Sequence, residues 1–363
     1  MDQASARAVL TNLLSGTTSV GASDLHLRAD FPPFVRIDGL MQRVNGPSMS
    51  ADQVEAIITH TSGRQPDPSG AEWEYSFEEV AGTRYRGHVF KVNGQLALTI
   101  RVIRALIPGF QELRVPVAVK VLSEKVPGLV LVTGPTGSGK TTTAASMLKT
   151  IAATSPTHIV TIEDPVEYRI LSPTSCVSQR EVGRDTRSYA DGLRAAMRED
   201  PDVLFIGEIR DTPALEVALQ AAESGHLVIS TFHTGSALQT IQRMWSMFPP
   251  EEQVPIRERI ADALRGIVCQ RLLPRSKTRG RILATEVMVN GYATRDLLRD
   301  PTKLKTLPSV LERSGDKHMH TLDQSLAALM ADGLVEAVVA LAHAIAPNDL
   351  RRTLNLAGSA VGS

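Results

Sequence analysis

Apolar and polar positions follow two different rhythms along this chain of 363 residues. Over the first hundred residues, short runs such as 23–27 (SDLHL) alternate with a period of two between turn residues, which is typical of half-buried strands. From Val117 onward, continuous apolar runs alternate with helical patterns. That alternation predicts a mostly parallel sheet with helices on both faces.

In this second region we expect strands at 128–133, 158–162, 202–206 and 226–231, and helices at 140–152, 189–199 and 212–223. The last helix is expected to have Thr212 as its N-cap and Pro213 in its first turn. Beyond about Pro250 the pattern is mainly helical, with one further strand at 282–289. The final residues, 358–363, are expected to form a disordered tail.

The first region contains two hairpin patterns. Residues 34–41 (FVRIDGLM) place Asp38-Gly39 between two short apolar runs. Asn93-Gly94 separates the runs 83–92 and 95–104 in the same way. Between the two hairpins we expect a short helix at 51–59 and a strand at 73–79.

A stretch without periodicity follows these hairpins. Residues 105–116 contain Pro108, Gly109 and Pro116, which are typical of a connecting segment. The sequence therefore predicts one domain at 1–104, a linker at 105–116 and a second domain at 117–363.

The Asn-Gly turn fixes the register of its hairpin, so that Val89 faces Leu98 and Arg86 faces Arg101. One face then collects Arg84, Arg86 and Arg101. Because like charges directly opposite each other destabilise a sheet, we expect an anionic group near this pair, with a solvated basic face as the alternative. The other face is expected to lie in the core, and it comprises Tyr85, Gly87, Val89, Leu98, Ile100 and Val102.

Composition excludes little but shifts the balance between function classes. Lys and Arg together number 39, as do Asp and Glu, so the formal net charge is zero, which argues against duplex DNA or an anionic membrane as the main partner. Two distant cysteines, Cys176 and Cys269, indicate reduced thiols in a cytoplasmic protein. The apolar stretch 327–346 is interrupted by charged residues, and no signal peptide is recognisable, so we expect no transmembrane segment.

A complete Walker A motif follows the strand at 128–133 and opens the helix that begins at Lys140. Its glycines let backbone N–H groups surround a phosphate chain at a helix N-terminus. Lys140 is expected to reach the β- and γ-phosphates, and Thr141 to bind Mg²⁺. The predicted nucleotide-binding residues are Gly134, Pro135, Thr136, Gly137, Ser138, Gly139, Lys140, Thr141 and Thr142.

Acidic residues follow two of the expected strands. Glu163 and Asp164 follow directly after the strand at 158–162, and Glu208 follows the strand at 202–206. Carboxyl ends of parallel strands meet at the ligand-binding edge of such a sheet, where carboxylates can polarise a water or serve a metal ion. Glu208 would hold Mg²⁺ through water, although Gly207 stands where a Walker B strand usually has an aspartate.

Two histidines bracket the strand at 226–231. His226 is its first residue, and a lone histidine in such a position is more often structural than catalytic. His233 follows it, beside Thr231 and Thr234, where it is placed to sense a γ-phosphate.

Four blocks of the sequence resemble, in this order, the Walker A, Asp box, Walker B and His box of the secretion and pilus motor ATPase superfamily. These blocks are GPTGSGKT, TIEDPVEY, DVLFIGEIRD and SGHLVISTFHT. The segments GASDLHL, PPFVRIDG, VSQREVGRDT, FPPEEQ and MHTLDQSLAALMADGL further resemble PilT-like retraction ATPases of type IV pili. Residues 293–300 (ATRDLLRD) are similar to the signature AIRNLIRE that is linked with retraction, although Thr294, Asp296 and Asp300 depart from it.

The resemblance implies an α/β fold, with a PAS-like N-terminal domain and a RecA-like ATPase domain whose C-terminal part is helical. It implies ATP and Mg²⁺ as ligands, a homo-hexamer, an inner-membrane platform protein as partner and a cytoplasmic position at the pilus base, without direct nucleic-acid binding. Glu163 would orient the attacking water, Glu208 would be the Walker B acid and His233 the His-box histidine. Arg84, Arg86 and Arg101 match N-terminal arginines that reach the nucleotide, although Gly94 replaces a further arginine of many relatives.

Other functions remain open at this point. Extension ATPases (PilB-like) and type II secretion ATPases usually carry an additional N-terminal domain and a four-cysteine zinc site, whereas this chain has two cysteines. A type IV secretion ATPase shares the boxes but usually lacks the retraction signature. A nucleic-acid translocase is disfavoured by the zero net charge. A non-catalytic regulatory paralogue is disfavoured by the intact Lys140, Glu163 and Glu208.

Overall fold

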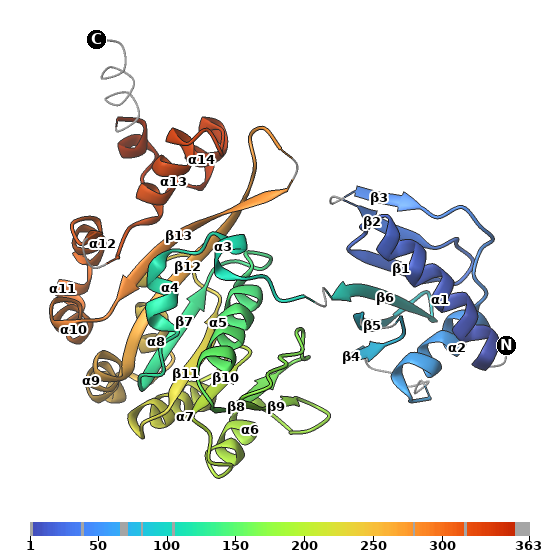
Figure 1. The fold of residues 1–363 in the computed structure, drawn as a ribbon, viewed down its shortest axis with the longest axis horizontal. Coiled ribbons are helices and arrows are strands. Elements are labelled where there is room, and N and C mark those ends of the chain that lie inside the picture. Colours follow the sequence, from blue (N-terminus) through green and yellow to red (C-terminus); the bar gives the residue numbers. More distant parts are fainter. Residues whose placement is uncertain are drawn as a thin grey trace. The chain divides into compact units, whose positions relative to one another are not determined.

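The computed structural model describes residues 3–37, 40–65, 72–80, 83–103, 106–278, 280–315 and 318–352. The chain divides into two compact units. The first unit contains residues 1–106 together with 165–169, and the second contains residues 107–164 and 170–363. Each unit has its own sheet and its own hydrophobic core (Figure 1).

An antiparallel sheet forms the first unit, with strand order β3-β2-β1-β6-β5-β4. The bounds are Asp24–Arg28 for β1, Phe34–Ile37 for β2, Leu40–Arg43 for β3, Trp73–Glu78 for β4, Arg84–Val92 for β5 and Gln95–Ile103 for β6. The pairing of β2 with β3 confirms the first expected hairpin, whereas its Asp38-Gly39 turn lies outside the described residues.

The second hairpin has the predicted register. Val89 pairs with Leu98 and Arg86 with Arg101 across β5 and β6. Tyr85, Val89 and Leu98 are fully buried, so the predicted core face is confirmed. The resemblance to a PAS domain remains a prediction, because an antiparallel sheet with two helices is compatible with it without requiring it.

Helices α1 (Gln3–Ser19) and α2 (Ala51–Ser62) share one core with the sheet. Helix α2 extends the predicted helix at 51–59 and begins with a capping box between Ser50 and Gln53. Helix α1 was not predicted. Its signal is nevertheless present, since Ala6, Leu10 and Leu14 recur every four residues and are fully buried.

A mixed sheet forms the second unit, with strand order β13-β12-β7-β11-β10-β8-β9. Every neighbouring pair is parallel except β12 with β13. The bounds are Gly128–Thr133 for β7, His158–Glu163 for β8, Cys176–Glu181 for β9, Val203–Ile206 for β10, Leu227–Phe232 for β11, Leu264–Pro274 for β12 and Arg281–Val289 for β13. The α/β class and the mostly parallel sheet are therefore confirmed.

Helices cover both faces of this sheet. Leu129 and Leu131 of β7 belong to the same core as helices α6 to α9. Helix α5 packs against β7 and β11 with buried residues outside that core, so it covers the opposite face. The bounds are Val117–Leu122 for α4, Lys140–Thr154 for α5, Tyr189–Ala196 for α6, Thr212–Glu223 for α7, Ala237–Ser246 for α8 and Gln253–Ala263 for α9, and the short helix α3 (Phe110–Leu113) lies in the predicted linker.

The C-terminal part is helical, as expected. Helices α13 and α14 pack on β12 and β13 and form a smaller core with Leu273 and Ile282. The bounds are Tyr292–Arg299 for α10, Pro301–Leu304 for α11, Leu307–Glu312 for α12, Leu322–Ala331 for α13 and Ala337–His343 for α14. The tail predicted at 358–363 lies outside the described residues.

Three details of the second unit differ from expectation. Strand β12 was expected to be helical, because polar residues such as Gln270, which is buried, interrupt its apolar run. The edge strand β9 (CVSQRE) was not predicted, because polar residues dominate it. The N-cap of α7 is Asp211 rather than Thr212, and the Asp211 carboxylate accepts the N–H of Ala214 at 2.9 Å.

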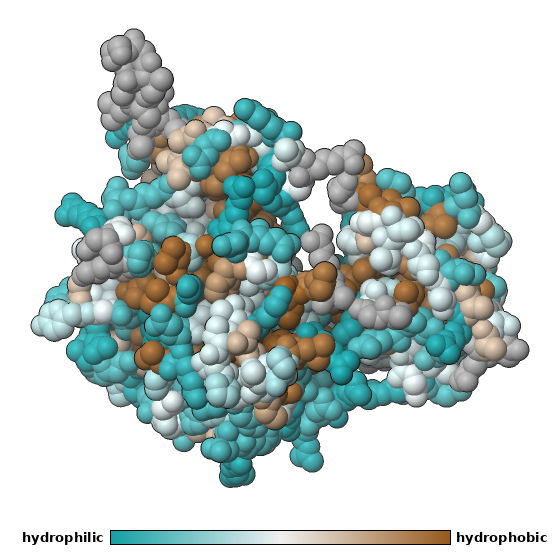
Figure 2. All heavy atoms as spheres, viewed as in Figure 1, coloured by the Kyte–Doolittle hydropathy of each residue, from teal (hydrophilic) through white to brown (hydrophobic). Residues whose placement is uncertain are grey.

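None of the helices in the described ranges is long and apolar enough to cross a membrane. On the face shown in Figure 2, hydrophobic and hydrophilic residues are interspersed over the surface of the second unit. The large exposed apolar residues of this unit include Val117, Val126, Val254 and Tyr292, which lie in separate parts of the sequence.

Close packing around β12 generates a test of this core. A Cβ atom at Gly266 would lie 2.7 Å from Leu122 Cδ2 and 2.8 Å from the Met288 carbonyl oxygen. Gly266→Ala should therefore lower the free energy of unfolding by about 1–3 kcal/mol, since a backbone atom cannot give way cheaply. Chemical denaturation measures this, and Gly315→Ala is the control because a Cβ there meets nothing within 4 Å. Equal effects of the two substitutions would contradict the packing described.

Candidate nucleotide-binding site

The Walker A residues form a loop between β7 and α5 at the carboxyl edge of the parallel sheet. Gly134, Gly137 and Gly139 have φ values of 145°, 79° and 88°, which only glycine adopts without strain. At Gly134 a side chain is excluded for a second reason, because a Cβ would lie 2.4 Å from the Gln270 carbonyl oxygen. Strand β12, which sequence reasoning missed, thus supports the loop from one side.

Lys140 is the first residue of α5 and is 7% exposed. Its Nζ donates hydrogen bonds to the carbonyl oxygens of Gly134 at 3.0 Å and Pro135 at 3.1 Å. The ammonium group is therefore held inside the curve of the loop. A buried cation is costly unless it is hydrogen-bonded, and these carbonyls stabilise it until an anion approaches.

The start of α5 differs from the starts of α6, α7 and α8 on the other face of the sheet. Ser188, Asp211 and Ser236 cap α6, α7 and α8 with their side chains, whereas α5 begins at Gly139 without any side-chain cap among the described residues. The buried Ser138 Oγ likewise has no hydrogen-bond partner in the described structure. Donors left in this way at a helix N-terminus fit the phosphates of a nucleotide.

Glu163 ends β8, and it is only 5% exposed. Its Oε1 accepts hydrogen bonds from Thr161 Oγ1 at 2.7 Å and from Gln179 Nε2 at 3.0 Å. These donors hold the carboxylate in one orientation, as expected of a group that positions a water. Gln179 lies on β9, and nothing in its polar surroundings marked it in the sequence.

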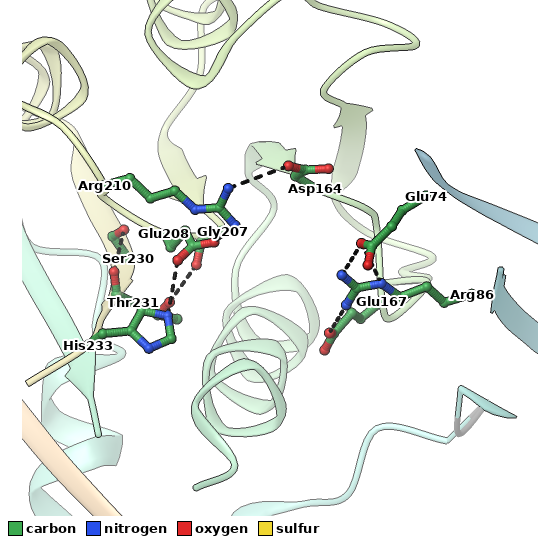
Figure 3. A network of polar contacts seen from close by, with 10 residues as sticks. All are labelled: Glu74, Arg86, Asp164, Glu167, Gly207, Glu208, Arg210, Ser230, Thr231 and His233. Atoms are coloured by element: carbon green, nitrogen blue, oxygen red, sulfur yellow. Dashed lines mark hydrogen bonds and ion pairs between the residues drawn. The ribbon is translucent and has the colours of Figure 1, made fainter. Parts of the chain in front are cut away.

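Glu208 follows β10, and each of its two carboxylate oxygens contacts a nitrogen-bearing side chain (Figure 3). Oε2 lies 3.0 Å from His233 Nε2, and Oε1 forms an ion pair with Arg210. Burial by itself would raise the pKa of Glu208, but the hydrogen bond and charge of Arg210 and the charge of His233 outweigh burial and hold the pKa below its ordinary value. The structure thus brings together Glu208 and His233, which the sequence predicted separately.

Arg210 also faces Asp164 Oδ2 at 3.9 Å, and its guanidinium carbon lies 6.0 Å from the ring centroid of Tyr189. Burial, together with the charges of Asp164 and Glu208, raises the pKa of Tyr189 well above its ordinary value. Sequence reasoning missed both Arg210 and Tyr189. Arg210 had a signal, because it lies two residues after Glu208 in the same block.

Gly207 occupies the position at which the sequence lacked the usual aspartate. A Cβ there would lie 3.3 Å from the Tyr189 hydroxyl oxygen and 3.4 Å from both Glu163 Cα and the Ile162 carbonyl oxygen. The glycine therefore lets the end of β10 pass close to β8, which places Glu163 and Glu208 on neighbouring strand ends.

The three predicted arginines lie in the first unit, where carboxylates of the chain accompany each of them. Arg86 forms ion pairs with Glu74 and, at 3.8 Å, with Glu167 (Figure 3), and Arg101 Nε donates to Asp24 Oδ1 at 2.8 Å. Arg84 lies 3.8 Å from Glu78 and donates to Ser76 Oγ at 2.9 Å. The predicted anionic group near Arg86 and Arg101 is thus supplied by the chain itself, and a role toward a nucleotide remains a prediction.

Within the described part of the chain, the hydrogen bonds of His226 go to none of these groups. Its Nδ1 lies 3.0 Å from the Ala221 carbonyl oxygen and 3.1 Å from Ser224 Oγ, at the end of α7. This is the arrangement of a structural histidine, and nothing in the geometry of the described residues links it to the Walker A loop.

Comparison with known proteins gives consistent matches. The family model described as "Type II/IV secretion system protein" matches residues 108–302. The type IV pilus retraction ATPase PilT of Pseudomonas aeruginosa is 40% identical over 329 residues, which cover 90% of this chain and 95% of that protein. A twitching motility protein of Neisseria gonorrhoeae is 38% identical over 84% of this chain and 82% of its own length. The crystal structure of the pilus retraction motor PilT with bound ADP has a TM-score of 0.86 at 40% identity, covering 93% of this chain and 98% of that one.

The conformation of the loop generates a prediction about Gly134. Gly134→Ala should weaken ADP binding at least about tenfold, because the new Cβ meets the Gln270 carbonyl and the backbone at φ 145° becomes strained. Calorimetric titration with ADP measures the loss. Gly183→Ala is the control, since Gly183 also has a positive φ, of 83°, but has open space around its Cβ position. An ADP affinity of Gly134→Ala equal to that of the control would show that the close approach to β12 does not shape the site.

Proposed function

The chain belongs to the type II/IV secretion system family and to its type IV pilus retraction ATPases, and from this membership we propose that it is a motor that hydrolyses ATP to retract type IV pili. The observation that carries the proposal is the joint presence of a Walker A loop with a buried lysine and two oriented carboxylates on neighbouring strand ends. These are the parts that positioning and electrostatic stabilisation of phosphoryl transfer require.

In the proposed mechanism, backbone N–H groups within the loop 134–142 hold the phosphates. Lys140 exchanges its two carbonyl partners for phosphate oxygens and so neutralises charge that develops during transfer. Glu163, fixed by Thr161 and Gln179, orients the attacking water.

Thr141 and, through water, Glu208 would hold Mg²⁺, which neutralises charge on the β- and γ-phosphates when it is bound. His233 would report on the γ-phosphate through its contact with Glu208.

The assembly belongs to the same proposal. We propose a homo-hexamer that acts at the cytoplasmic side of the pilus base on a platform protein of the inner membrane. The domain division at 105–116 would let the N-terminal domain move against the ATPase domain. Arg84, Arg86 and Arg101 would reach the nucleotide in the closed state by exchanging their carboxylate partners for phosphate oxygens. Such an exchange would couple hydrolysis to rigid-body motion.

Besides its proposed contact with the nucleotide, Arg101 has a structural function, because it pairs with the nearly buried Asp24. Its partner Asp24 is 5% exposed, and although burial opposes ionisation, hydrogen bonds from Ser23 and Arg101 hold the pKa of Asp24 below its ordinary value. Removal of Arg101 would leave a nearly buried carboxylate without its cation. Arg86 is therefore the better arginine for tests of nucleotide contact, since its partner Glu74 is more exposed.

The hydrolysis proposal is tested by Glu163→Gln. The substitution should lower kcat at least about 100-fold, because the amide cannot accept a proton from water, while ADP affinity stays within about twofold. ATP hydrolysis is measured over a protein concentration series that spans assembly, with the oligomer followed by light scattering. Glu199→Gln is the control, because it removes the same charge. Glu199 forms an ion pair with Arg180, and both residues are distant in sequence from the Walker A loop.

Either of two results would contradict this part of the proposal. Full hydrolysis by Glu163→Gln would remove the carboxylate from the mechanism. A wild-type hexamer that binds MgATP without hydrolysing it would point to a non-catalytic regulatory protein instead.

The direction of pilus movement is tested in cells. Deletion of the gene from its host should leave surface pili that no longer retract, and twitching motility should be lost, because disassembly then lacks its motor. Fluorescently labelled pili, followed by microscopy, measure retraction events, and complementation with the Glu163→Gln chain should fail where the wild-type chain succeeds. Loss of surface pili in the deletion strain would indicate an extension motor instead.

A further inference from the structure

Arg210 lies between the carboxylate of Glu208, which is a proposed metal ligand, and the carboxylate of Asp164. It forms an ion pair with Glu208 and faces Asp164 Oδ2 at 3.9 Å, and these carboxylates follow the neighbouring strands β10 and β8 (Figure 3). A divalent cation with oxygen ligands would draw on the same carboxylates. Arg210 is thus positioned as a monovalent counterion within the acidic edge of the sheet.

The partners in this cluster differ in their freedom to move. The side chain of Glu208 is 15% exposed and is also held by His233, whereas the side chain of Arg210 is 58% exposed. A shift of Glu208 would also break its contact with His233, but Arg210 can swing toward solvent on its long, flexible side chain. When two charges compete for one carboxylate, Arg210 is therefore the group that leaves.

A second contact remains for Arg210 after such a shift. Its guanidinium lies within 6.0 Å of the Tyr189 ring, a distance at which a cation is attracted to an aromatic face. Tyr189 opens α6 and packs against Gly207, so it does not depend on Glu208 for its own position. The ring can retain the displaced side chain near the site.

We propose that Arg210 is a positioning residue that holds Glu208 and Asp164 while Mg²⁺ is absent and that Mg²⁺ displaces it when nucleotide binds. The inference rests on the proposed function, because it concerns the metal of the same site. Arg210 keeps the carboxylates apart from other cations and in the orientation that a water-mediated Mg²⁺ contact needs. Its displacement makes metal binding weaker than the carboxylates alone would allow.

The cost of displacement is modest. Ion pairs between partly exposed side chains are typically worth up to about 1 kcal/mol, which corresponds to about fivefold in affinity. Mutual repulsion between Arg210 and a divalent cation at the same carboxylates adds to this cost. Removal of the guanidinium should therefore tighten the coupling between metal and nucleotide, whereas general damage to the site would loosen it.

The test compares ADP affinity with and without metal. Anisotropy of a fluorescent ADP analogue gives its dissociation constant in excess EDTA and in saturating Mg²⁺. The constant in EDTA divided by the constant in Mg²⁺ measures the coupling between metal and nucleotide. Arg210→Gln should raise this ratio about fivefold over wild type, and Arg210→Lys, which keeps a positive charge, should raise it less. Complexation of Mg²⁺ by free ADP is the same for every variant and cancels in the comparison.

Arg259→Gln is the matched control. Arg259 forms a hydrogen-bonded pair with Glu223 at the far end of α7, and the side chain loses the same charge on substitution. The ratio for this variant should equal that of wild type. An unchanged or lower ratio for Arg210→Gln would overturn the inference and would assign Arg210 to structure or to direct phosphate contact. Wild-type protein that binds no ADP in either condition would instead overturn the proposed function itself.

Discussion

The parallel arrangement of β7, β11, β10 and β8 is the constraint on which the site depends. In a parallel sheet every carboxyl end lies at one edge, so the residues that follow these strands converge although they are far apart in sequence. The Walker A loop follows β7, Glu163 ends β8, Glu208 follows β10 and His233 follows β11. Unpaired, these buried or half-buried charges would be costly, and hydrogen bonds from the chain itself hold each of them.

The partners of these charges also determine what the site can do. Glu163 accepts hydrogen bonds from two neutral donors, Thr161 and Gln179, which orient its carboxylate for a water. Glu208 contacts His233 and forms an ion pair with Arg210, so the charge of Arg210 compensates its carboxylate until another cation arrives. Two carboxylates on adjacent strands thereby acquire different chemistry from their surroundings, which is a common way in which active sites separate functions.

The sequence predicted most of what is local in this molecule. Strand β7, the Walker A loop and the hairpin register around Asn93-Gly94 follow from short-range patterns, because turn geometry and continuous apolar runs are determined within a few residues. The prediction for β12 was wrong, because its polar Gln270 is buried. The side-chain amide of Gln270 donates a hydrogen bond to Thr143 on α5, which is distant in sequence. Gln179 was missed for the same reason, since its partner Glu163 lies 16 residues away in the sequence. Arg210 lies close to Glu208 in the sequence, but its contact with Asp164 arises only from the pairing of β8 with β10.

Long-range polar contacts of this kind also connect the site with the C-terminal helices. The buried Glu286 of β13 accepts the N–H of Ala237, at the start of α8, at 2.7 Å and also accepts a backbone hydrogen bond from Leu322, at the start of α13. Burial raises the pKa of Glu286, and the two helix N-termini partly offset that effect. Because α8 begins four residues after His233, one carboxylate fixes both the helix that follows the His-box residue and the helix that opens the C-terminal core. Glu286 therefore joins the start of α8, in the larger core, to the start of α13, in the C-terminal core.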